Sequence, residues 1–413
     1  MSASQIVVVG GGHATEQLCA RLVEADNSRP VRVISSEAVL PYHRPPLSKN
    51  YLKTASAQPT LIRQQNWYDT NSIALELGRT AVSIDRVEKT VKLDDERVIP
   101  YEKLVLATGS RARAHPLLPN TLENVLTLRD LGDAQRLRQT LHACGSLAII
   151  GGGFIGLEVA AIAKSLGKEV TVVEASPRIM GRAVSAEISD HVRSVHESDG
   201  VNFKIGTVIT DVAVDGNRLD AVTLSDSEQP LRADVFVVSI GSVPNTSLAE
   251  AAGIACEDGI LVDAQMLTSD RSVFAVGDCA RFPVTTSLGE STTMRLESIQ
   301  SASVQARAAA YALVGRAAPK DVAPWFWSDQ GGLKIQMAGI LPREAQGLQS
   351  TRRAGNTSQS FTLFHSIDEK LVAVEAVNAS SDYLAARALL DSGAVVDVRQ
   401  LADTGTSLVG KVN

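Results

Sequence analysis

The sequence has few cysteines, and none of them has the spacing of a redox or metal-binding pair. Four occur among 413 residues, at Cys19, Cys144, Cys256 and Cys279. Without C-x-x-C or C-x-x-x-x-C, neither a dithiol beside a cofactor nor an iron–sulfur or zinc site is expected. We therefore expect each cysteine to be a small buried apolar residue. The seven histidines are scattered along the chain, so no metal site is predicted.

Long apolar runs and a charge excess of one sign are also missing. No run approaches the ~20 residues that cross a bilayer, so no membrane association is expected. The first residues, MSASQ, lead directly into an apolar run, which leaves no space for a signal peptide and favours a cytoplasmic protein. The formal net charge of −6 is dispersed, which argues against a nucleic-acid partner. The length predicts two or three domains.

What the sequence does contain is a dinucleotide-binding pattern at its centre. An apolar run over 147–150 ends at Gly151, and Gly153 and Gly156 complete G-x-G-x-x-G before a helical pattern. The three glycines permit a tight turn, a close approach of pyrophosphate to the backbone, and close packing of helix on strand. Glu174 ends the next apolar run, at the spacing from Gly151 that this motif requires of its acid. An acid there can accept both ribose hydroxyls and would repel a 2′-phosphate, so NAD is favoured over NADP.

The same pattern occurs near the start of the chain. An apolar run over 5–9 leads to Gly10 and Gly12, and a later apolar run leads to Glu37. Thr15 stands where the third glycine is expected. We expect its side chain either to separate helix and strand slightly or to project elsewhere. A second nucleotide, bound at the N-terminus of the following helix, is predicted.

A proline-rich loop follows, with the sequence PYHRPPLSK over 41–49. Its prolines make a rigid support for two cations, Arg44 and Lys49. The loop is either an ordinary solvated basic segment or a source of positive charge for an anionic cofactor. Two dinucleotide motifs in one chain favour the cofactor.

Further strands are predicted to end at small residues or at a carboxylate. The run over 103–107 ends in Ala107-Thr108-Gly109, the run over 235–240 ends at Gly241, and the run over 272–276 ends at Gly277-Asp278. Small residues at a strand end fit a close approach of backbone to ligand. The carboxyl ends of parallel strands bind ligands in α/β sheets, so Asp278 is either a ligand contact or a helix cap.

The remaining segments fill in the architecture. Residues 60–100 are predicted to form a helix and short antiparallel strands, with Val82 and Ile84 on one apolar face. Helices are expected from Asp130 to about 142, over 184–199, and over 301–314. After residue 330 the alternation of apolar and polar residues predicts strands, followed by a helix over 383–390. Trp327 is either a core residue or a wall against a flat ring.

Taken together, these residues resemble the FAD-dependent NADH:ferredoxin reductases of bacterial oxygenase systems, including those of aromatic hydrocarbon catabolism. That family resembles glutathione reductase in fold and includes putidaredoxin reductase and the reductases of biphenyl-type dioxygenases. The resemblance spans the chain and rests on PYHRPPLSK, ATG, GGGFIGLE, VGDCARF, RLESIQ and PWFWSDQ, in that order. It implies an α/β fold with two Rossmann-like dinucleotide-binding domains and an α+β C-terminal domain. The FAD domain would comprise 1–112 and 246–322, the NADH domain 113–245, and the C-terminal domain 323–413.

The resemblance also implies site residues. FAD would contact Ala14, Glu37, Arg44, Lys49, Val82, Thr108, Arg129, Asp278, Ile299 and Trp327. NADH would contact Gly151, Gly153, Gly156, Glu174 and Arg182, with Glu158 and Glu297 near the nicotinamide. The other candidate cofactor contacts flank these positions and are Gly10, Gly12, His13, Ala107, Gly109, Phe154, Ile155, Gly241, Gly277 and Ser298. Besides Thr15, Gly331 after SDQ departs from the family pattern and bears on the face offered to the partner.

The implied reaction is hydride transfer from NADH to FAD, followed by release of single electrons to a [2Fe–2S] ferredoxin. The cofactors carry this chemistry, so no protein nucleophile is needed. Lys49, paired with Glu158, is expected to stabilise the negative charge of reduced flavin, and Trp327 to lie by the flavin ring on the partner-facing side.

The expected partner is acidic, and Arg343, Arg352 and Arg353 are candidates for the basic patch that binds it; an ordinary solvated face is the alternative. A monomer or weak dimer is expected. The rival functions are an NADH oxidase or peroxidase of the same fold, and an NADH-sensing flavoprotein resembling apoptosis-inducing factor.

Overall fold

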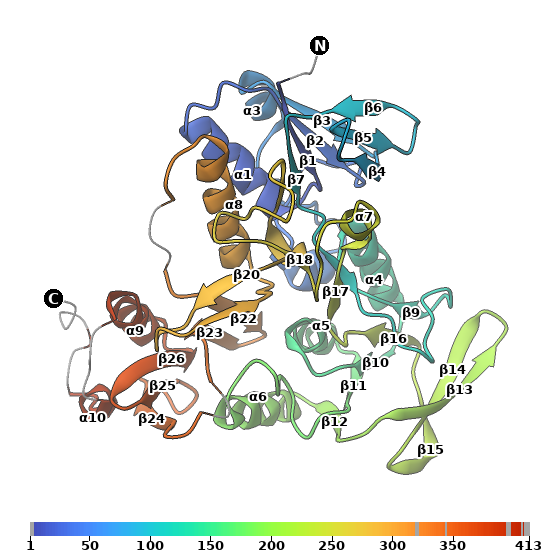
Figure 1. The fold of residues 1–413 in the computed structure, drawn as a ribbon. Coiled ribbons are helices and arrows are strands. Elements are labelled where there is room, and N and C mark those ends of the chain that lie inside the picture. Colours follow the sequence, from blue (N-terminus) through green and yellow to red (C-terminus); the bar gives the residue numbers. More distant parts are fainter. Residues whose placement is uncertain (1–3, 319–321, 343–344, 394–397, 406–407, 409–413) are drawn as a thin grey trace. The chain divides into compact units, whose positions relative to one another are not determined.

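The computed structural model describes residues 4–318, 322–342, 345–393, 398–405 and 408 (Figure 1). Its contacts divide the chain into two compact units. Unit 1 comprises Met1–His43, Thr60–Arg111 and Val243–Phe326, and unit 2 comprises Arg44–Pro59, Ala112–Ser242 and Trp327–Asn413. The predicted division into FAD, NADH and C-terminal domains differs from these units, since Arg44–Pro59 is part of unit 2 and not of unit 1, and it stays a prediction.

Unit 1 is built on a five-stranded parallel sheet in the order β19-β7-β1-β2-β3. Its strands are β1 (Ile6–Val9), β2 (Val31–Ser35), β3 (Ile73–Leu77), β7 (Lys103–Leu106) and β19 (Val273–Ala275). The central strand β1 consists of β-branched residues that are buried on both faces, as is typical of a covered parallel sheet. Helices α1 (His13–Glu24) and α8 (Ile299–Leu313) pack against each other on one side of it (Figure 1).

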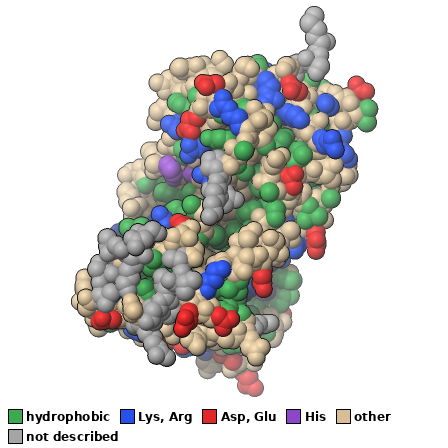
Figure 2. Space-filling model, turned by 60° about the vertical axis from the view of Figure 1, so that its left-hand side comes forward, with side chains coloured by type: hydrophobic (Ala, Val, Ile, Leu, Met, Phe, Trp, Pro, Cys, Tyr) green, Lys and Arg blue, Asp and Glu red, His purple; other side chains and the backbone are tan. Residues whose placement is uncertain are grey.

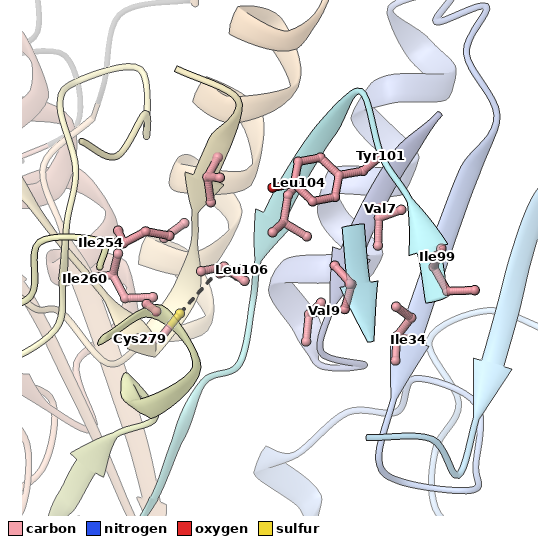
Figure 3. Packing of buried hydrophobic residues seen from close by; sticks show 14 of the residues in the cluster. Val7, Val9, Ile34, Ile99, Tyr101, Leu104, Leu106, Ile254, Ile260 and Cys279 are labelled. Carbon is pink, nitrogen blue, oxygen red and sulfur yellow. Dashed lines mark hydrogen bonds between the residues drawn. The ribbon is translucent and has the colours of Figure 1, made fainter. Parts of the chain in front are cut away.

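The other face of this sheet is covered by a small antiparallel sheet. Its strands are β4 (Ala81–Asp85), β5 (Thr90–Leu93) and β6 (Val98–Pro100). Val7 and Val9 of β1 join Ile99 and Tyr101 in one buried cluster, which also includes residues around Ile254 (Figure 3). Unit 1 also contains α3 (Gln65–Thr70), α7 (Ser247–Ala251), β18 (Ile260–Leu261), η2 (Gly277–Cys279), β20 (Ala280–Thr285) and β21 (Ser291–Met294).

Unit 2 repeats the parallel arrangement in the order β12-β11-β10-β16-β9. Its strands are β9 (Val125–Leu126), β10 (Ser146–Ile150), β11 (Glu169–Glu174), β12 (Val201–Ile205) and β16 (Val235–Val238). Its helices are η1 (Pro45–Ser48), α2 (Asn50–Lys53), α4 (Leu131–Ala143), α5 (Phe154–Ser165) and α6 (Ala186–Ser198). An antiparallel sheet of β13 (Ile209–Asp215), β14 (Arg218–Leu224) and β15 (Ser227–Arg232) packs on one face. Strands β8 (Ser110–Ala112) and β17 (Ser242–Pro244) lie where the chain passes between the units.

The C-terminal part forms a five-stranded sheet in the order β22-β23-β26-β25-β24. Its strands are β22 (Trp325–Gln330), β23 (Leu333–Gly339), β24 (Gln349–Ala354), β25 (Phe361–Ile367) and β26 (Lys370–Val377), followed by α9 (Ser380–Ser392) and α10 (Val398–Ala402). Ile335 and Phe361 of this sheet share a buried cluster with Leu157 of α5 and Ile188 of α6. The sheet and the nucleotide-binding fold of unit 2 therefore have a common core.

The predicted fold class is confirmed, and most predicted elements lie close to the observed bounds. Two expectations for local structure were wrong. Residues 73–77 form β3, which joins the parallel sheet instead of an antiparallel one. Val82 is 50% exposed, so it does not share an apolar face with Ile84. Among the described residues no helix combines the length and the apolar character that crossing a bilayer requires.

Candidate dinucleotide sites and a buried ion pair

In unit 1 a glycine turn joins β1 to α1. Gly10 has a φ of 121°, and a Cβ on it would lie 2.0 Å from the carbonyl oxygen of Ala107. Only glycine fits at such a distance. Gly12 is the N-cap of α1, and no described heavy atom lies within 4 Å of where its Cβ would be. The space lies beside N–H groups of the first helical turn, which have no partner within the helix, so it suits a phosphate.

Thr15 occupies the place of the third glycine in unit 1. Its side chain is buried, and its hydroxyl donates a hydrogen bond to the carbonyl oxygen of Gly10 over 2.7 Å. The departure from the motif is thus accommodated by a bond that ties the first turn of α1 to the glycine turn.

Unit 2 builds the same turn between β10 and α5. Gly151 has a φ of 110°, and a Cβ on it would lie 2.3 Å from the carbonyl oxygen of Ser239. Gly153 is the N-cap of α5 and its surroundings are open, with that carbonyl 4.0 Å from its Cβ position. A Cβ on Gly156 would lie 2.5 Å from the carbonyl oxygen of Gly151. The third position therefore requires glycine here, whereas unit 1 holds Thr15.

The acid of the second motif lies beside its glycine turn. Glu174 ends β11, and its Oε2 accepts a hydrogen bond of 2.7 Å from the backbone N–H of Gly152. Its Oε1 accepts another, of 2.7 Å, from the N–H of Ser176. The carboxylate is thereby held at the strand end, next to the helix N-terminus, where a ribose would lie.

The acid of the first motif is placed differently. The N–H of Gly10 bonds to the carbonyl of Ile34, and that of Gly151 to the carbonyl of Val173. Ser35 therefore occupies the register position of Glu174, and Glu37 lies further along the chain. The hydroxyl of Tyr42 donates to Glu37 Oε2 over 2.5 Å. The two predicted ribose acids are thus not equivalent in register.

The other strand ends of unit 1 are joined by side-chain hydrogen bonds. Thr108 Oγ1 donates to the carbonyl of Asn245 over 2.7 Å, and Asn245 Nδ2 donates back to the carbonyl of Thr108 over 2.9 Å. The buried Gln305 of α8 accepts from the N–H of Gly277 over 2.7 Å. Asp278 lies in the short helix η2, where Ser110 Oγ donates to it over 3.3 Å. These bonds fix the Ala107–Gly109 and Gly277–Asp278 segments at one edge of the sheet.

Two further helix N-terminal features belong to unit 1. Ser298 caps α8 by accepting from the N–H of Ser301 over 3.0 Å. His13, the first residue of α1, has its Nε2 3.1 Å from Ser303 Oγ. Burial is the main cause that lowers the pKa of His13, so this residue is neutral at pH 7 beside the open glycine turn.

In unit 2 the predicted pair Lys49 and Glu158 forms an ion pair whose carboxylate is buried and whose lysine is 20% exposed. Lys49 Nζ lies 2.9 Å from Glu158 Oε1, and the Glu158 side chain is 6% exposed. Two hydroxyls donate to the same carboxylate, from Ser328 to Oε1 over 2.6 Å and from Ser48 to Oε2. Glu158 lies in the first turns of α5, close in sequence to the glycine turn. The predicted pairing is confirmed by geometry, while its catalytic role stays a prediction.

The remaining predicted residues are dispersed over both units. In unit 2, Arg44 Nη1 donates to the carbonyl of Arg129 over 2.9 Å, and Arg182 Nη2 lies 3.4 Å from the Cβ position of Gly241. Several others are partly or largely exposed, as ligand contacts are expected to be; these are Val82, Thr108, Gly109, Phe154, Ile155, Glu297, Ile299 and Trp327.

One predicted docking residue is placed where it cannot bind a partner. Arg353 is 7% exposed, and its guanidinium bonds to Asp382 over 3.1 Å and to the carbonyls of Leu401 and Asp403. It is a structural residue of the C-terminal sheet. Arg352 is about half exposed and pairs with Glu187 over 2.5 Å. Arg343 lies outside the described residues.

Burial makes the four cysteine thiols less acidic than usual. All are free, with Cys19 and Cys279 buried and Cys144 and Cys256 half-buried, so the expectation that each cysteine is buried was wrong for two of them. Burial raises the pKa of Cys19 to about 12 and that of Cys256 to about 11, and it also raises the pKa of Cys144 and Cys279. Because the thiolate is the nucleophile, none of these residues is activated for thiol chemistry.

Sequence reasoning missed Ser48, Ser328 and Gln305. Ser48 and Ser328 were quoted only as letters of the PYHRPPLSK and PWFWSDQ motifs, and Gln305 carried no signal beyond its place in an alanine-rich helix. Each contacts a segment that is distant from it in sequence. No local pattern could have identified such partners.

The residues present fit two dinucleotides. Each parallel sheet has a glycine turn with an open second position, a helix that begins there, and polar groups fixed at the neighbouring strand ends. A Cβ at either open position would occupy the space where a pyrophosphate approaches the backbone. The site geometry therefore defines a protein with two dinucleotide-binding folds.

Comparison with known proteins agrees with this class. Residues 4–306 match the family model described as pyridine nucleotide-disulphide oxidoreductase, and residues 325–410 match the model described as reductase C-terminal. Rhodocoxin reductase of Rhodococcus erythropolis is 38% identical over 98% of this chain and 93% of its own length. Terpredoxin reductase of a Pseudomonas species is 39% identical over 97% of this chain and 96% of its own length.

Solved structures are also similar. The ferredoxin reductase for the CYP199A2 system from Rhodopseudomonas palustris has a TM-score of 0.92 and 39% identity, over 98% of both chains. The reductase in the covalent putidaredoxin reductase–putidaredoxin complex has a TM-score of 0.92 and 32% identity, over 99% of this chain and 98% of that one. The chain belongs to the pyridine nucleotide-disulphide oxidoreductase family, and its cofactors are FAD and NAD(H).

A side chain at the third position of the glycine motif should be harmful in unit 2, at Gly156, and tolerated in unit 1, at Thr15. Gly156→Ala would place a Cβ 2.5 Å from the carbonyl of Gly151, and overpacking of this kind costs about 1–3 kcal/mol. We expect the Kd for NADH to rise about ten- to a hundredfold, measured by titration of the FAD-loaded protein. Thr15→Ala loses one hydrogen bond, worth on the order of 1 kcal/mol, and should retain FAD. Unchanged NADH affinity in Gly156→Ala would contradict the predicted role of this turn.

Proposed function

We propose that this protein is an NADH-dependent, FAD-containing reductase that passes electrons singly to a [2Fe–2S] ferredoxin, which feeds an oxygenase. The observation that carries the proposal is the combination of two dinucleotide sites with four unactivated thiols. A disulphide reductase of this family needs a reactive dithiol beside its cofactor. Without one, electrons taken from NADH must leave to an acceptor outside the chain.

The names of the relatives support a redox-protein acceptor. They include rhodocoxin reductase, terpredoxin reductase and the ferredoxin–NAD(+) reductase component of an anthranilate 1,2-dioxygenase system from Burkholderia cepacia, the last 38% identical over 99% of this chain. The solved complex contains putidaredoxin. The relatives serve a dioxygenase system in one case and the CYP199A2 system in another, so the proposal leaves the oxygenase open. We place the protein in the cytoplasm, where NADH is produced.

The assignment of residues follows the structure unit by unit. In unit 1, FAD would be held by the Gly10–Gly12 turn and the Ala107–Gly109 and Gly277–Asp278 segments. In unit 2, NADH would be held by the Gly151–Gly156 turn and Glu174. Bound FAD would accept a hydride and release electrons one at a time. The balanced reaction converts NADH and two oxidised ferredoxins into NAD⁺, one proton and two reduced ferredoxins.

Lys49 would supply positive charge where hydride transfer brings negative charge. Its ammonium is oriented by Glu158, at 2.9 Å, and by the carbonyl of Pro45, at 3.4 Å. Glu158 in turn is held by two serine hydroxyls. The lysine therefore has one fixed direction in which to present its remaining N–H group, instead of the many rotamers of a surface lysine.

Docking of an acidic ferredoxin would require local positive charge. Figure 2 shows Lys and Arg side chains interspersed with Asp and Glu on the face it displays, in keeping with a net charge of −6. Of the three arginines considered, Arg353 is excluded by its burial, and Arg352 is already paired with Glu187 and lies over the ring of Phe361 at 4.0 Å. The predicted group of Arg343, Arg352 and Arg353 therefore cannot form the docking patch in full.

The function is tested by ferredoxin-dependent reduction of cytochrome c. With NADH and a [2Fe–2S] ferredoxin present, the FAD-loaded protein should reduce cytochrome c, and omission of ferredoxin should remove most of the rate. Rapid NADH consumption by oxygen or peroxide without ferredoxin would indicate an oxidase or peroxidase. Tight NADH binding with no ferredoxin reduction would indicate an NADH-sensing flavoprotein.

Lys49→Met should slow hydride transfer. It removes a charge-assisted interaction worth on the order of 1.5–3 kcal/mol, which equals about tenfold or more in rate. The measurement is the bleaching of flavin absorbance by NADH in a stopped-flow instrument, together with the flavin reduction potential. Lys53→Met, an exposed lysine in the neighbouring α2, is the matched control and should leave both values unchanged. If Lys49→Met behaves like the control, the proposed role is wrong.

Trp327→Ala should impair electron transfer to ferredoxin more than it impairs the reduction of the flavin by NADH. If the indole lies at the partner-facing side of the flavin, ferredoxin reduction should fall more than reduction of a small dye by NADH. Trp67→Ala is the control, because Trp67 is a half-buried indole in α3, outside β22. Equal losses in both assays would count against a role in electron output.

A further inference from the structure

A continuous row of buried polar side chains connects the Lys49–Glu158 pair to a histidine of helix α6, all within unit 2. Ser328 Oγ lies 2.6 Å from Glu158 Oε1, and Gln330 Nε2 lies 3.2 Å from Ser328 Oγ. Gln330 Oε1 lies 2.9 Å from Nε2 of His196. Ser328, Gln330 and His196 are all at most 2% exposed. Buried polar groups are costly unless they are paired, so a row of this length calls for an explanation.

The direction of donation along the row is determined by chemistry. A carboxylate can only accept hydrogen bonds, so the Ser328 hydroxyl must donate its one hydrogen to Glu158. Its oxygen is then free to accept, which requires the amide nitrogen of Gln330 to face it. The amide oxygen of Gln330 consequently faces His196 and needs an N–H there. Every donor in the row therefore points towards Glu158.

This direction specifies the state of His196. Its Nε2 must carry the proton, and Nδ1 has no hydrogen-bond partner in the part of the chain that the structure describes. Burial is the main cause that lowers the pKa of this imidazole, against smaller opposing effects of Gln330 and Asp199. The ring also packs edge-on against Phe203, with 6.4 Å between ring centroids. His196 is thus a neutral Nε2–H imidazole in an apolar setting.

We propose that Ser328, Gln330 and His196 act as positioning residues that hold the Glu158 carboxylate aligned with Lys49. The proposal rests on the proposed function in that Lys49 is taken to promote hydride transfer. Ser48 secures Oε2 of the carboxylate, and the row secures Oε1. Without the row, Oε1 would keep only the lysine, and the carboxylate could rotate about its last torsion.

The row also gives β22 a dual role. Trp327 and Ser328 are adjacent in this strand, so their side chains point to opposite faces. The strand therefore presents the indole on one face while its next residue secures Glu158 on the other. Gln330 continues on the Ser328 face. The contacts that fix Glu158 therefore also fix the strand that carries Trp327.

Removing one donor at a time tests the proposal on the FAD-loaded protein. Ser328→Ala and His196→Phe should each slow flavin reduction by NADH about tenfold at saturating NADH, with the KM for NADH within about twofold of the parent. Ser328→Thr keeps the hydroxyl and should restore the rate. Thr362→Val is the matched control, since Thr362 is buried in the same sheet and its hydroxyl has no described partner.

A second readout does not depend on activity. With ¹⁵N-labelled histidine, the His196 resonance, assigned by its loss in His196→Phe, should report a neutral Nε2–H tautomer at pH 7. Gln330→Leu should change that signal. A protonated ring or an Nδ1–H tautomer would overturn the proposed direction, and an unchanged rate in Ser328→Ala would overturn the positioning role. Failure of the protein to reduce any ferredoxin would instead overturn the proposed function, since flavin reduction by NADH is measured without ferredoxin.

Discussion

A carbonyl oxygen packed directly against a glycine determines where each nucleotide-binding helix begins. In unit 1 it is the carbonyl of Ala107 against Gly10, and in unit 2 that of Ser239 against Gly151. A side chain at either glycine would push the turn away from the neighbouring strand and displace the helix N-terminus from the strand ends. This contact determines where the phosphate-binding N–H groups lie. In unit 2 it also places the N–H of Gly152 that bonds to Glu174.

The buried carboxylate of Glu158 in unit 2 depends on partners that compensate its negative charge. A buried carboxylate is stabilised only when its oxygens are paired, because the loss of hydration costs several kcal/mol per ion. Glu158 receives an ammonium and two hydroxyls, which come from the proline-rich loop and from β22. One of these segments lies near the beginning of the chain and the other in its C-terminal part. The ion pair therefore joins the loop, helix α5 and the C-terminal sheet as well as orienting Lys49.

Local signals made the fold and the turns predictable, whereas contacts between distant segments were not. The glycine patterns, the apolar runs and the alternation after residue 330 each report a period or a turn that a short window contains. The partners of Glu158 beyond Lys49, and the burial of Arg353, depend on which strands become neighbours. Thr15 was recognised as a departure from the third glycine of the motif, but its bond to the Gly10 carbonyl could not be predicted from the residue type alone. Val82 was misjudged because β4 has a register shift between Ala81 and Ser83, which breaks the alternation of faces that the prediction assumed.

The raised pKa of the thiols has a consequence for durability. At pH 7, a thiol with a pKa of about 12 is ionised in roughly one molecule in 10⁵, and peroxide reacts with the ionised form. Burial therefore protects the Cys19 sulfur from peroxide by keeping it almost entirely in the thiol form.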